Sequence, residues 1–368
     1  MPIGIDISRL ATSTRTGTEQ YTYELLAAIA RIEAHHAFRL YAGAMPASLP
    51  PLGGNFALRV MPARRLWTHV RLSAEILRAP PEVLFVPAHV LPLALPLARR
   101  TRGVVTIHDL GYLAFPEHHT RAQRIALSLS TRWSVRVAQH VIAISAATRD
   151  ALIRHLRVDP ARISVVHHGV APRFAQPPDA AARGRITALL GTAPYLLCIG
   201  TVQPRKNLLR LIDALAAAPD APRLVIAGRR GWLAEPIERR AAALGIAGRV
   251  RFTGYLDDRD LPALYAGATA FVFPSLYEGF GMPVLEAMAA GTPVLTANTS
   301  ALPEVAGDAA LLIDPGDVAA IAAGLSQISH DTALRQRLSV AGRQRAATFS
   351  WERCAQHTLT ILRQVAAH

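Results

Sequence analysis

Two glutamates lie eight residues apart on either side of a glycine-containing loop. Glu278 and Glu286 belong to the stretch FVFPSLYEGFGMPVLEAMAAG, and Gly279 and Gly281 lie between them. Carboxylate oxygens accept hydrogen bonds from pairs of hydroxyl groups, and glycines allow a ligand to approach the backbone closely. Glu286 alone could be an ordinary first-turn glutamate that interacts with a helix dipole, but the whole arrangement favours a site for a sugar-like ligand.

The loop is expected to lead into a helix. A strand-like run ends at Ser275, Pro283 suits the first turn of a helix, and Gly291 suits its end. Glu278 is therefore predicted on the loop and Glu286 early in the helix. Free N–H groups at the helix start favour anionic oxygens, so the same place suits a phosphate-bearing ligand.

A single lysine, Lys206, stands among 40 basic residues that are otherwise arginines. It belongs to GTVQPRKNL, where Arg205 precedes it and the strand-like run YLLCIG comes before both. GC-rich coding is the simplest explanation of an arginine-rich composition, so chance is one explanation of the single lysine. The other is a position that requires a compact, flexible ammonium group rather than a planar guanidinium.

His108 follows a strand-like run in the tetrapeptide TIHD. One interpretation is a helix-capping or core histidine. The pair His-Asp also occurs in metal hydrolases, but those sites need more histidine and aspartate ligands than this region offers. We therefore expect no metal here.

Short apolar runs alternate with helical segments along the chain. Such runs, ended by Gly, Pro or Asp, are typical of a parallel sheet covered on both faces. The predicted strands are residues 3–8, 38–43, 57–63, 82–88, 103–109, 140–145, 163–169, 195–200, 223–228, 250–254, 270–275, 293–298 and 310–314. The pattern predicts an α/β protein with two Rossmann-like domains, in which ligands bind beyond the carboxyl ends of the strands.

The domain boundary is expected in the proline-rich segment 169–184. We predict an N-terminal domain of residues 1–172 and a C-terminal domain of residues 173–351 that face each other across a cleft. The chain has 368 residues, of which 51% are hydrophobic, and this is enough for two cores.

The sequence predicts a cytoplasmic protein. The N-terminal MPIGIDISRL alternates like a strand and lacks a basic region followed by an apolar run, so no secretory signal is predicted. The longest apolar stretch, VLFVPAHVLPLALPLA, is too short to span a bilayer and contains three prolines. Two cysteines are too few for a disulfide framework.

The net charge of +14 is concentrated in the first half. Residues 1–172 contain 20 arginines against 10 acidic residues, whereas the remainder contains 20 basic against 16 acidic residues. Segments 63–79 and 120–140 mix arginines with Leu, Ile, Val and Trp. They are either solvated helix faces or a surface for anionic lipid or a phosphate-bearing acceptor. No nucleic-acid motif accompanies the charge, so we expect no nucleic-acid partner.

The stretch EGFGMPVLEAMAAGTPV resembles the signature of the retaining glycosyltransferases of family 4, which carry a Glu–x7–Glu pair. Further similar motifs follow the family's order along almost the full chain: RTGTEQYTYELL, TIHDLGYLAFPE, VIAISAATRDAL, VVHHGV, CIGTVQPRKNLLRL, LVIAGRRGW, VRFTGYLDDRDLPALYAGA and FSWERCAQHTLTIL. The resemblance implies the GT-B fold, in which the last helix, here residues 352–368, crosses back to pack on the first domain.

The resemblance also implies roles for the loop and the helix after it. Glu286 would bind the ribose hydroxyls of a nucleotide diphosphate sugar, and Glu278 would contact hydroxyls of the donor hexose. Gly279, Phe280 and Gly281 would present backbone amides to the sugar and the phosphates.

Cations and an aromatic residue complete the donor site that the resemblance implies. Arg205 and Lys206 would neutralise the diphosphate, whose charge leaves with the nucleotide, and a mobile ammonium could follow it as bonds break. Gly228, Arg229 and Tyr255 would line the nucleotide base and ribose.

In the first domain, the resemblance places His108 on the donor sugar's side of the cleft, with Asp109 orienting it. Gly17, in a loop with Thr16, would lie near the acceptor and the phosphates. The expected catalytic residues are thus His108, Glu278 and Lys206.

The chain departs from the family pattern in two places. Relatives often have an arginine directly after the glycine that ends the phosphate strand, where this chain has Thr201, and some have a second glycine in the loop at Gly17. No Asp-x-Asp metal element occurs at a strand end, and DDRD (257–260) is interpreted as a helix cap.

The resemblance therefore implies metal-independent, retaining transfer of a hexose. A carboxylate nucleophile would suit Glu278, but front-face attack with the leaving diphosphate as base is preferred. No cofactor is expected besides the nucleotide sugar.

The sequences of the motifs most resemble those of bacterial mannosyltransferases that build lipid-linked oligosaccharides such as O-antigen. GDP-mannose is therefore the favoured donor, with UDP-glucose, UDP-galactose and dTDP-rhamnose open. The expected acceptor is a lipid-linked oligosaccharide at the inner face of the cytoplasmic membrane, which the basic first half would contact peripherally. The alternatives are a GT-B nucleotide-sugar 2-epimerase and a non-catalytic two-lobed sugar-binding protein.

Overall fold

The computed structural model describes residues 2–12, 17–63, 66–116, 120–231 and 234–367. The chain forms two compact units: Met1–Gly169 together with Ser350–His368, and Val170–Phe349. The sequence placed the two divisions after residue 172 and before residue 352.

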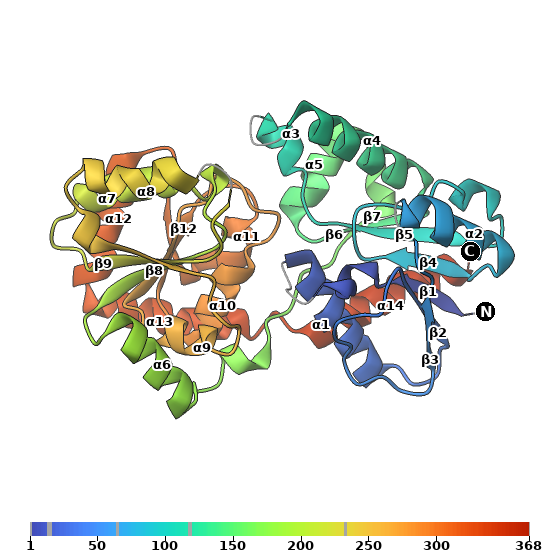
Figure 1. Cartoon of the computed structure of the whole chain (residues 1–368), viewed down its shortest axis with the longest axis horizontal. Helices are drawn as coiled ribbons and strands as arrows, with labels where there is room; N and C mark the ends of the chain where they lie inside the picture. The colour runs from blue at the N-terminus through green and yellow to red at the C-terminus, as the bar shows by residue number, and fades with distance from the viewer. Residues whose placement is uncertain (1, 13–16, 64–65, 117–119, 232–233, 368) are drawn as a thin grey trace. The chain divides into compact units, whose positions relative to one another are not determined.

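The first unit contains a seven-stranded parallel sheet with the strand order β3-β2-β1-β4-β5-β6-β7 (Figure 1). Every strand pair is parallel. The strands are β1 (Ile3–Asp6), β2 (Phe38–Ala42), β3 (Phe56–Val60), β4 (Val83–Val86), β5 (Arg102–Ile107), β6 (His140–Ala143) and β7 (Ile163–Val165).

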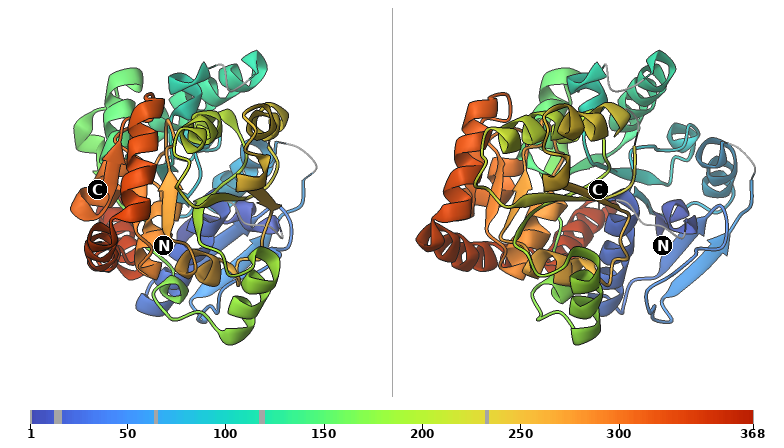
Figure 2. Two further views of the ribbon diagram at one scale, coloured as in Figure 1. Left: turned by 90° about the vertical axis from the view of Figure 1, so that its left-hand side faces the viewer. Right: turned by 60° about the vertical axis from the view of Figure 1, so that its left-hand side comes forward.

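Helices cover both faces of this sheet (Figures 1 and 2). They are α1 (Gly17–Ile32), the π-helical η2 (Thr68–Leu72), α2 (Ser73–Arg78), α3 (Gly111–Ala114), α4 (Arg121–Val137), α5 (Ala146–Leu156) and α14 (Trp351–Ala367). The last of these, α14, packs against α1 and the strands β4, β5 and β6. This confirms the expected return of the C-terminal helix to the first unit.

The second unit contains a six-stranded parallel sheet with the order β10-β9-β8-β11-β12-β13. Its strands are β8 (Tyr195–Ile199), β9 (Arg223–Ala227), β10 (Val250–Gly254), β11 (Ala270–Phe273), β12 (Val294–Ala297) and β13 (Leu311–Ile313). The central strands β8 and β11 are neighbours although they are far apart in sequence, so the sheet changes its winding direction between them.

The α-helices of the second unit are α6 (Ala180–Leu190), α7 (Leu208–Ala216), α8 (Ala234–Ala243), α9 (Leu261–Ala266), α10 (Met282–Ala290), α11 (Leu302–Ala306), α12 (Val318–His330) and α13 (Thr332–Ala346). Short 3-10 turns include η6 (Pro172–Phe174) and η7 (Pro204–Lys206). On one face α7 packs with α8 and α12, and on the other face α10 packs with α9 and α13 (Figure 1).

All thirteen predicted strands are present, because central strands buried on both faces give near-continuous apolar runs. The four residues of β4, VLFV, and the four of β11, AFVF, are all buried. Every strand except β10 ends slightly earlier than predicted, most clearly β7, where the chain leaves the sheet after Val165. Among the described residues, no helix is both long and apolar enough to cross a membrane.

Gly169 lies where the first segment of the first unit ends, in close contact with the start of its second segment. A Cβ atom at Gly169 would lie 2.1 Å from the backbone nitrogen of Trp351 and 2.4 Å from the carbonyl carbon of Ser350. Backbone atoms cannot move aside as a side-chain tip can, so any side chain here must push the two segments apart.

We predict that Gly169→Ala lowers the free energy of unfolding by about 1–3 kcal/mol, the usual cost of overpacking. The matched control is Gly54→Ala, because a Cβ at Gly54 meets no atom within 4 Å. Urea denaturation followed by circular dichroism compares both variants with the parent chain. Equal stability of the two variants would contradict the prediction.

Candidate active site

The loop between β11 and α10 carries Glu278 beyond the carboxyl end of a central strand. The following helix α10 begins at Met282, has Pro283 in its first turn and ends before Gly291, as the sequence predicted. Gly281 adopts φ +119°, and a Cβ there would lie 2.9 Å from Leu302 Cδ2, so this turn requires glycine. Phe280 belongs to the same loop, and its side chain is buried against Phe349.

Glu278 is buried and surrounded by donors from two loops. Lys206 Nζ donates to its Oε1 at 2.7 Å, Ser275 Oγ donates to the same oxygen at 2.6 Å, and Arg205 Nη1 lies 2.8 Å from Oε2. Burial by itself raises the pKa of Glu278, but the charges of Lys206 and Arg205 outweigh it and hold that pKa at about 2. The carboxylate is therefore ionised, and with its two cations it leaves a net charge of +1 on the cluster.

Lys206 occupies a confined position in η7, directly after β8. Its side chain is only 10% exposed, and its ammonium lies 4.5 Å from the centroid of the Phe273 ring. Its Cε is 3.0 Å from the place where a Cβ at Gly200 would stand. Burial lowers the pKa of Lys206 by more than the neighbouring Glu278 raises it, so the pKa lies below its usual value. The confined space suits a compact ammonium, as the sequence analysis expected, and its mobility during the reaction stays a prediction.

Backbone contacts fasten the Lys206 loop to the Glu278 loop. The backbone oxygen of Arg205 accepts a hydrogen bond from Leu276 N at 3.0 Å, and it lies 3.1 Å from Ser275 Oγ, whose proton goes to Glu278. The buried side chain of Asn207 donates to Pro274 O at 3.1 Å and to Pro315 O at 2.7 Å. The sequence analysis gave Ser275 and Asn207 no role at the site, although both lie within stretches that it quoted.

Glu286 lies on α10 and is partly buried. Its Oε2 accepts a hydrogen bond of 2.9 Å from the hydroxyl of Tyr265, on α9. Burial raises the pKa of Glu286 to about 7, against the hydrogen bond from Tyr265 and the charge of Arg173, which lower it. Glu286 thus differs from Glu278: one carboxylate is held ionised, and the other titrates near neutrality.

The predicted residues after β9 and β10 also come together. Gly228 has φ +149°, and a Cβ there would lie 2.1 Å from the backbone oxygen of Gly200, so the ends of β8 and β9 approach closely only without a side chain. The guanidinium of Arg229 lies 4.8 Å from the centroid of the Tyr255 ring, which is 51% exposed. This pair forms an accessible planar surface beyond the strand ends.

His108, in the first unit, follows β5 and is buried. Its Nε2 lies 2.7 Å from the backbone oxygen of Pro87 and must donate to it, which leaves Nδ1 as the acceptor of the ring. Burial lowers the pKa of His108 to about 4, so the ring is neutral at pH 7. Pro87 therefore orients His108, in place of the expected Asp109, which accepts from Gly111 N at 2.8 Å.

His89 is a further residue beside His108 that the sequence analysis missed. Its Nε2 accepts a hydrogen bond of 3.2 Å from the backbone N–H of His108, and the two rings are stacked with centroids 5.5 Å apart. His89 comes shortly after β4, so the rule that chemistry lies beyond strand ends could have found it.

Gly17 was predicted in a loop, but it is the first residue of helix α1. A Cβ at Gly17 would meet no atom within 4 Å. Four residues on, Tyr21 packs edge-on against His108, with ring centroids 4.9 Å apart. Thr16 lies outside the described residues.

The prediction that DDRD caps a helix is correct for the position of Asp260 but wrong for its side chain. Asp260 occupies the N-cap position of α9, but its side chain makes no capping hydrogen bond. Its Oδ1 instead accepts from Arg185 at 2.6 Å, because a guanidinium competes successfully for the carboxylate. Among the described residues, no group of three or more His, Cys, Asp or Glu side chains could hold a metal ion.

Each of the two units matches a known protein-family model. Residues 15–174 match the family model described as Glycosyltransferase Family 4, and residues 185–345 match the model described as Glycosyl transferases group 1. O-antigen chain mannosyltransferase B of Escherichia coli is 36% identical over 272 residues, which are 71% of this chain and 70% of the relative. The chain belongs to glycosyltransferase family 4. It is a hexosyltransferase related to mannosyltransferases of O-antigen assembly.

A further relative and two solved structures are also similar to this chain. MMP alpha-(1->4)-mannosyltransferase of Mycolicibacterium hassiacum is 29% identical over 297 residues, which are 72% of this chain and 68% of the relative. The structure of sucrose-phosphate synthase from Thermosynechococcus elongatus has a TM-score of 0.80 at 23% identity and covers 100% of this chain and 99% of that one. WaaG, a glycosyltransferase of lipopolysaccharide biosynthesis, has a TM-score of 0.74 at 18% identity, covering 98% and 99% of the two chains. These likenesses show the GT-B fold.

We predict that Lys206→Met lowers the rate of hexose transfer by about 10²- to 10³-fold, the usual loss when one donor to a developing charge is removed. The same change lowers stability, because Glu278 loses one of its two cations. Lys206→Arg is also impaired, since the larger guanidinium does not fit between Gly200 and Phe273. Steady-state kinetics and thermal unfolding measure the two effects.

Arg240→Met is the matched control for this experiment, because Arg240 pairs with Asp213 on the surface of the same unit. It should change neither rate nor stability appreciably. Normal turnover of both Lys206 variants would remove Lys206 from the reaction.

Proposed function

We propose that this glycosyltransferase transfers mannose from GDP-mannose, with retention and without a metal ion, to a lipid-linked or oligosaccharide acceptor in cell-surface polysaccharide synthesis. The observation that carries the proposal is the cluster of Lys206, Arg205 and Glu278 beyond the ends of β8 and β11. It combines two cations with a carboxylate where a diphosphate and a hexose would have to lie together.

The charges of the cluster suit departure of a nucleoside diphosphate. In the proposed reaction the acceptor oxygen bonds to the anomeric carbon while the bond from that carbon to the diphosphate oxygen breaks, and the acceptor proton passes to the leaving phosphate. Arg205 and Lys206 would stabilise the negative charge that develops on the diphosphate. Protein cations could thereby supply the stabilisation that a metal ion gives elsewhere.

The surroundings of Glu278 favour a binding role over a nucleophilic one. Both of its oxygens already accept from donors, and its pKa of about 2 makes it a weak base. A carboxylate held in this way can still accept hydrogen bonds from hexose hydroxyls. This supports front-face attack over a covalent intermediate on Glu278, while the proposed contact of His108 with the donor sugar stays a prediction.

The names of the relatives favour mannose, because three of them are mannosyltransferases, with identities of 36%, 29% and 28%. A thermal-shift panel of GDP-, UDP- and dTDP-sugars, followed by nucleotide-release assays with the best ligand, tests this. We expect GDP-mannose to give the largest stabilisation, about 2.7 kcal/mol at 100 times its Kd. Lys206→Met should lose most of this stabilisation.

Each other outcome of the panel points to a different function. Stronger stabilisation by a UDP- or dTDP-sugar would replace the donor. Nucleotide release without any acceptor sugar would indicate the 2-epimerase, and binding without release would indicate a sugar-binding protein.

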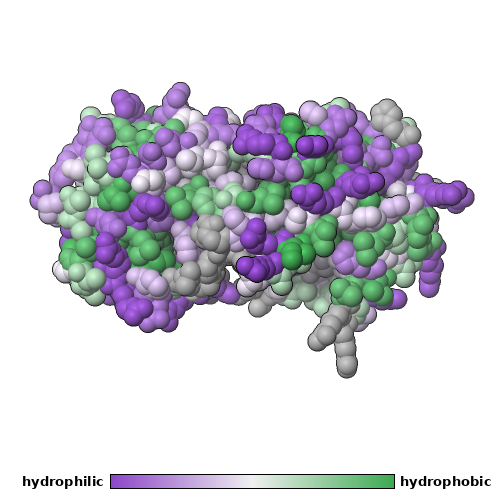
Figure 3. Space-filling view, turned by 90° about the horizontal axis from the view of Figure 1, so that it is seen from above, coloured by the Kyte–Doolittle hydropathy of each residue, from purple (hydrophilic) through white to green (hydrophobic). Residues whose placement is uncertain are grey.

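We also propose that the basic first unit contacts an anionic membrane peripherally. Helix α4, RAQRIALSLSTRWSVRV, carries four arginines and no acidic residue, and its Ile125 and Leu129 are 62% and 64% exposed. Around η2 and α2, the apolar side chains of Leu66, Val70 and Leu77 are exposed as well. Figure 3, seen from the side of α4, has hydrophobic residues directly beside hydrophilic ones. Apolar side chains among arginines suit the interface of an anionic bilayer.

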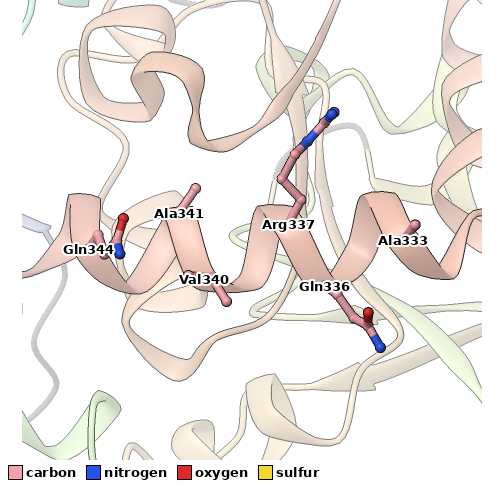
Figure 4. A pocket seen from close by; sticks show the side chains of 6 residues that line it. All are labelled: Ala333, Gln336, Arg337, Val340, Ala341 and Gln344. Atoms are coloured by element: carbon pink, nitrogen blue, oxygen red, sulfur yellow. The ribbon is translucent and has the colours of Figure 1, made fainter.

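We predict that the protein floats with vesicles containing anionic lipid at low salt, and that Ile125→Ser combined with Leu129→Ser reduces the bound fraction several-fold. The control is Val340→Ser on α13 of the second unit, where Val340 is 59% exposed near Arg337 but is flanked by Gln336 and Gln344 (Figure 4). Absence of flotation of the parent chain, or equal loss in the control, would count against membrane contact through α4.

A further inference from the structure

We infer that Tyr265 is a positioning residue for the donor: its hydroxyl holds one oxygen of Glu286 and leaves the other oxygen to accept hydrogen bonds from the ribose. This inference rests on the proposed function, in which Glu286 binds the nucleotide ribose. The sequence motifs give Tyr265 no role, since it lies in the apolar stretch LPALYAGA.

The hydrogen bond from Tyr265 reaches Glu286 from a different helix. Tyr265 Oη donates to Glu286 Oε2 at 2.9 Å, from α9 to α10. Within the described residues, Oε1 of Glu286 makes no hydrogen bond to the protein. One oxygen is thus fixed by a neutral donor, while the second keeps both of its lone pairs for a ligand.

Tyr265 itself is held so firmly that it can define the position of the carboxylate. The side chain is completely buried, and its ring packs edge-on against Phe174 and Phe271 with centroids 5.7 and 5.4 Å away. The backbone oxygen of Tyr265 accepts from Thr292 Oγ1 at 2.8 Å, just beyond the end of α10. The two helices are therefore joined at both the side chain and the backbone of one tyrosine.

The charge of Glu286 depends on the same contact. The groups that act on it are Tyr265 from α9, Arg173 from η6 and Asp258 from the loop before α9. Burial, and to a smaller extent Asp258, raise the pKa of Glu286, whereas Tyr265 and Arg173 lower it, and the resulting pKa is about 7. The ionised form, which accepts hydrogen bonds at both oxygens, therefore predominates above about pH 7 and is lost as the pH falls. Removal of the Tyr265 hydroxyl should raise the pKa again and extend this loss to higher pH.

The test is Tyr265→Phe, assayed for donor KM, kcat and the pH dependence of kcat/KM. Loss of one hydrogen bond to a charged group should raise the donor KM about 10-fold or more at pH 7, with kcat changed by less than about twofold, since Glu286 lies away from the reacting carbon in the proposed complex. The acid limb of kcat/KM, which reports the free enzyme, should move to higher pH.

The matched control is Tyr195→Phe. Tyr195 is another buried tyrosine of the same unit, and its hydroxyl donates to the backbone oxygen of Leu264 at 2.7 Å, next to Tyr265 in the chain. The control removes an equivalent buried hydrogen bond without touching Glu286. It should leave the donor KM and the acid limb unchanged even if stability falls.

A second variant keeps the inference testable if Tyr265→Phe does not fold. Site-specific replacement of Tyr265 by 3-fluorotyrosine preserves the shape and strengthens the hydroxyl as a donor, so the acid limb should move to lower pH. An acid limb that stays in place in the fluorinated protein, or in folded Tyr265→Phe, overturns the inference.

Failure of the proposed function would look different. If the parent chain binds no nucleotide sugar in the thermal-shift panel, the proposed function fails before Tyr265 is tested. If the parent binds and transfers, but Glu286→Gln retains the acid limb, then Glu286 is not the titrating group and the inference about Tyr265 falls while transfer stands.

Discussion

A buried carboxylate is costly unless cations and hydrogen-bond donors surround it, and Glu278 meets this requirement with groups from two loops. Lys206 and Arg205 come from the loop after β8, whereas Ser275 precedes Glu278 on the loop after β11. The same ionic contact that neutralises the carboxylate therefore fastens the two loops together. Candidate groups for diphosphate and hexose are held at fixed separation by this one cluster.

The topology of the second sheet explains why these loops meet. Strands β8 and β11 are neighbours, but the helices that follow them, α7 and α10, pack on opposite faces of the sheet. The connections diverge beyond the strand ends and leave room there, as in other doubly wound sheets. Glycines at positions 200 and 228 allow the backbone at the ends of β8 and β9 to approach closely at this edge of the sheet.

The sequence was sufficient for the fold but only partly for the site. Buried parallel strands are recognisable as apolar runs, so all thirteen strands were predicted. The residues of the Glu278 and Lys206 loops were predicted from their motifs. Tyr265, Ser275, Asn207 and His89 were not found, because their importance comes from partners distant in sequence or from the way a loop folds back. Lys206 was found for its rarity, but its burial against Gly200 and Phe273 could be known only once β8 and β11 were neighbours. Asp260 shows the reverse case, in which a local capping rule yields to an ion pair with Arg185.

A protein with one lysine carries one side-chain amine. Apart from the N-terminal amine, reagents that modify amines can therefore react at a single position, which is buried inside the Glu278 cluster. Reductive methylation with ¹³C-formaldehyde would give one lysine methyl signal in an NMR spectrum, with no assignment problem. The rate at which that signal appears, and its chemical shift, would report directly how often the cluster opens and which charge lies beside it.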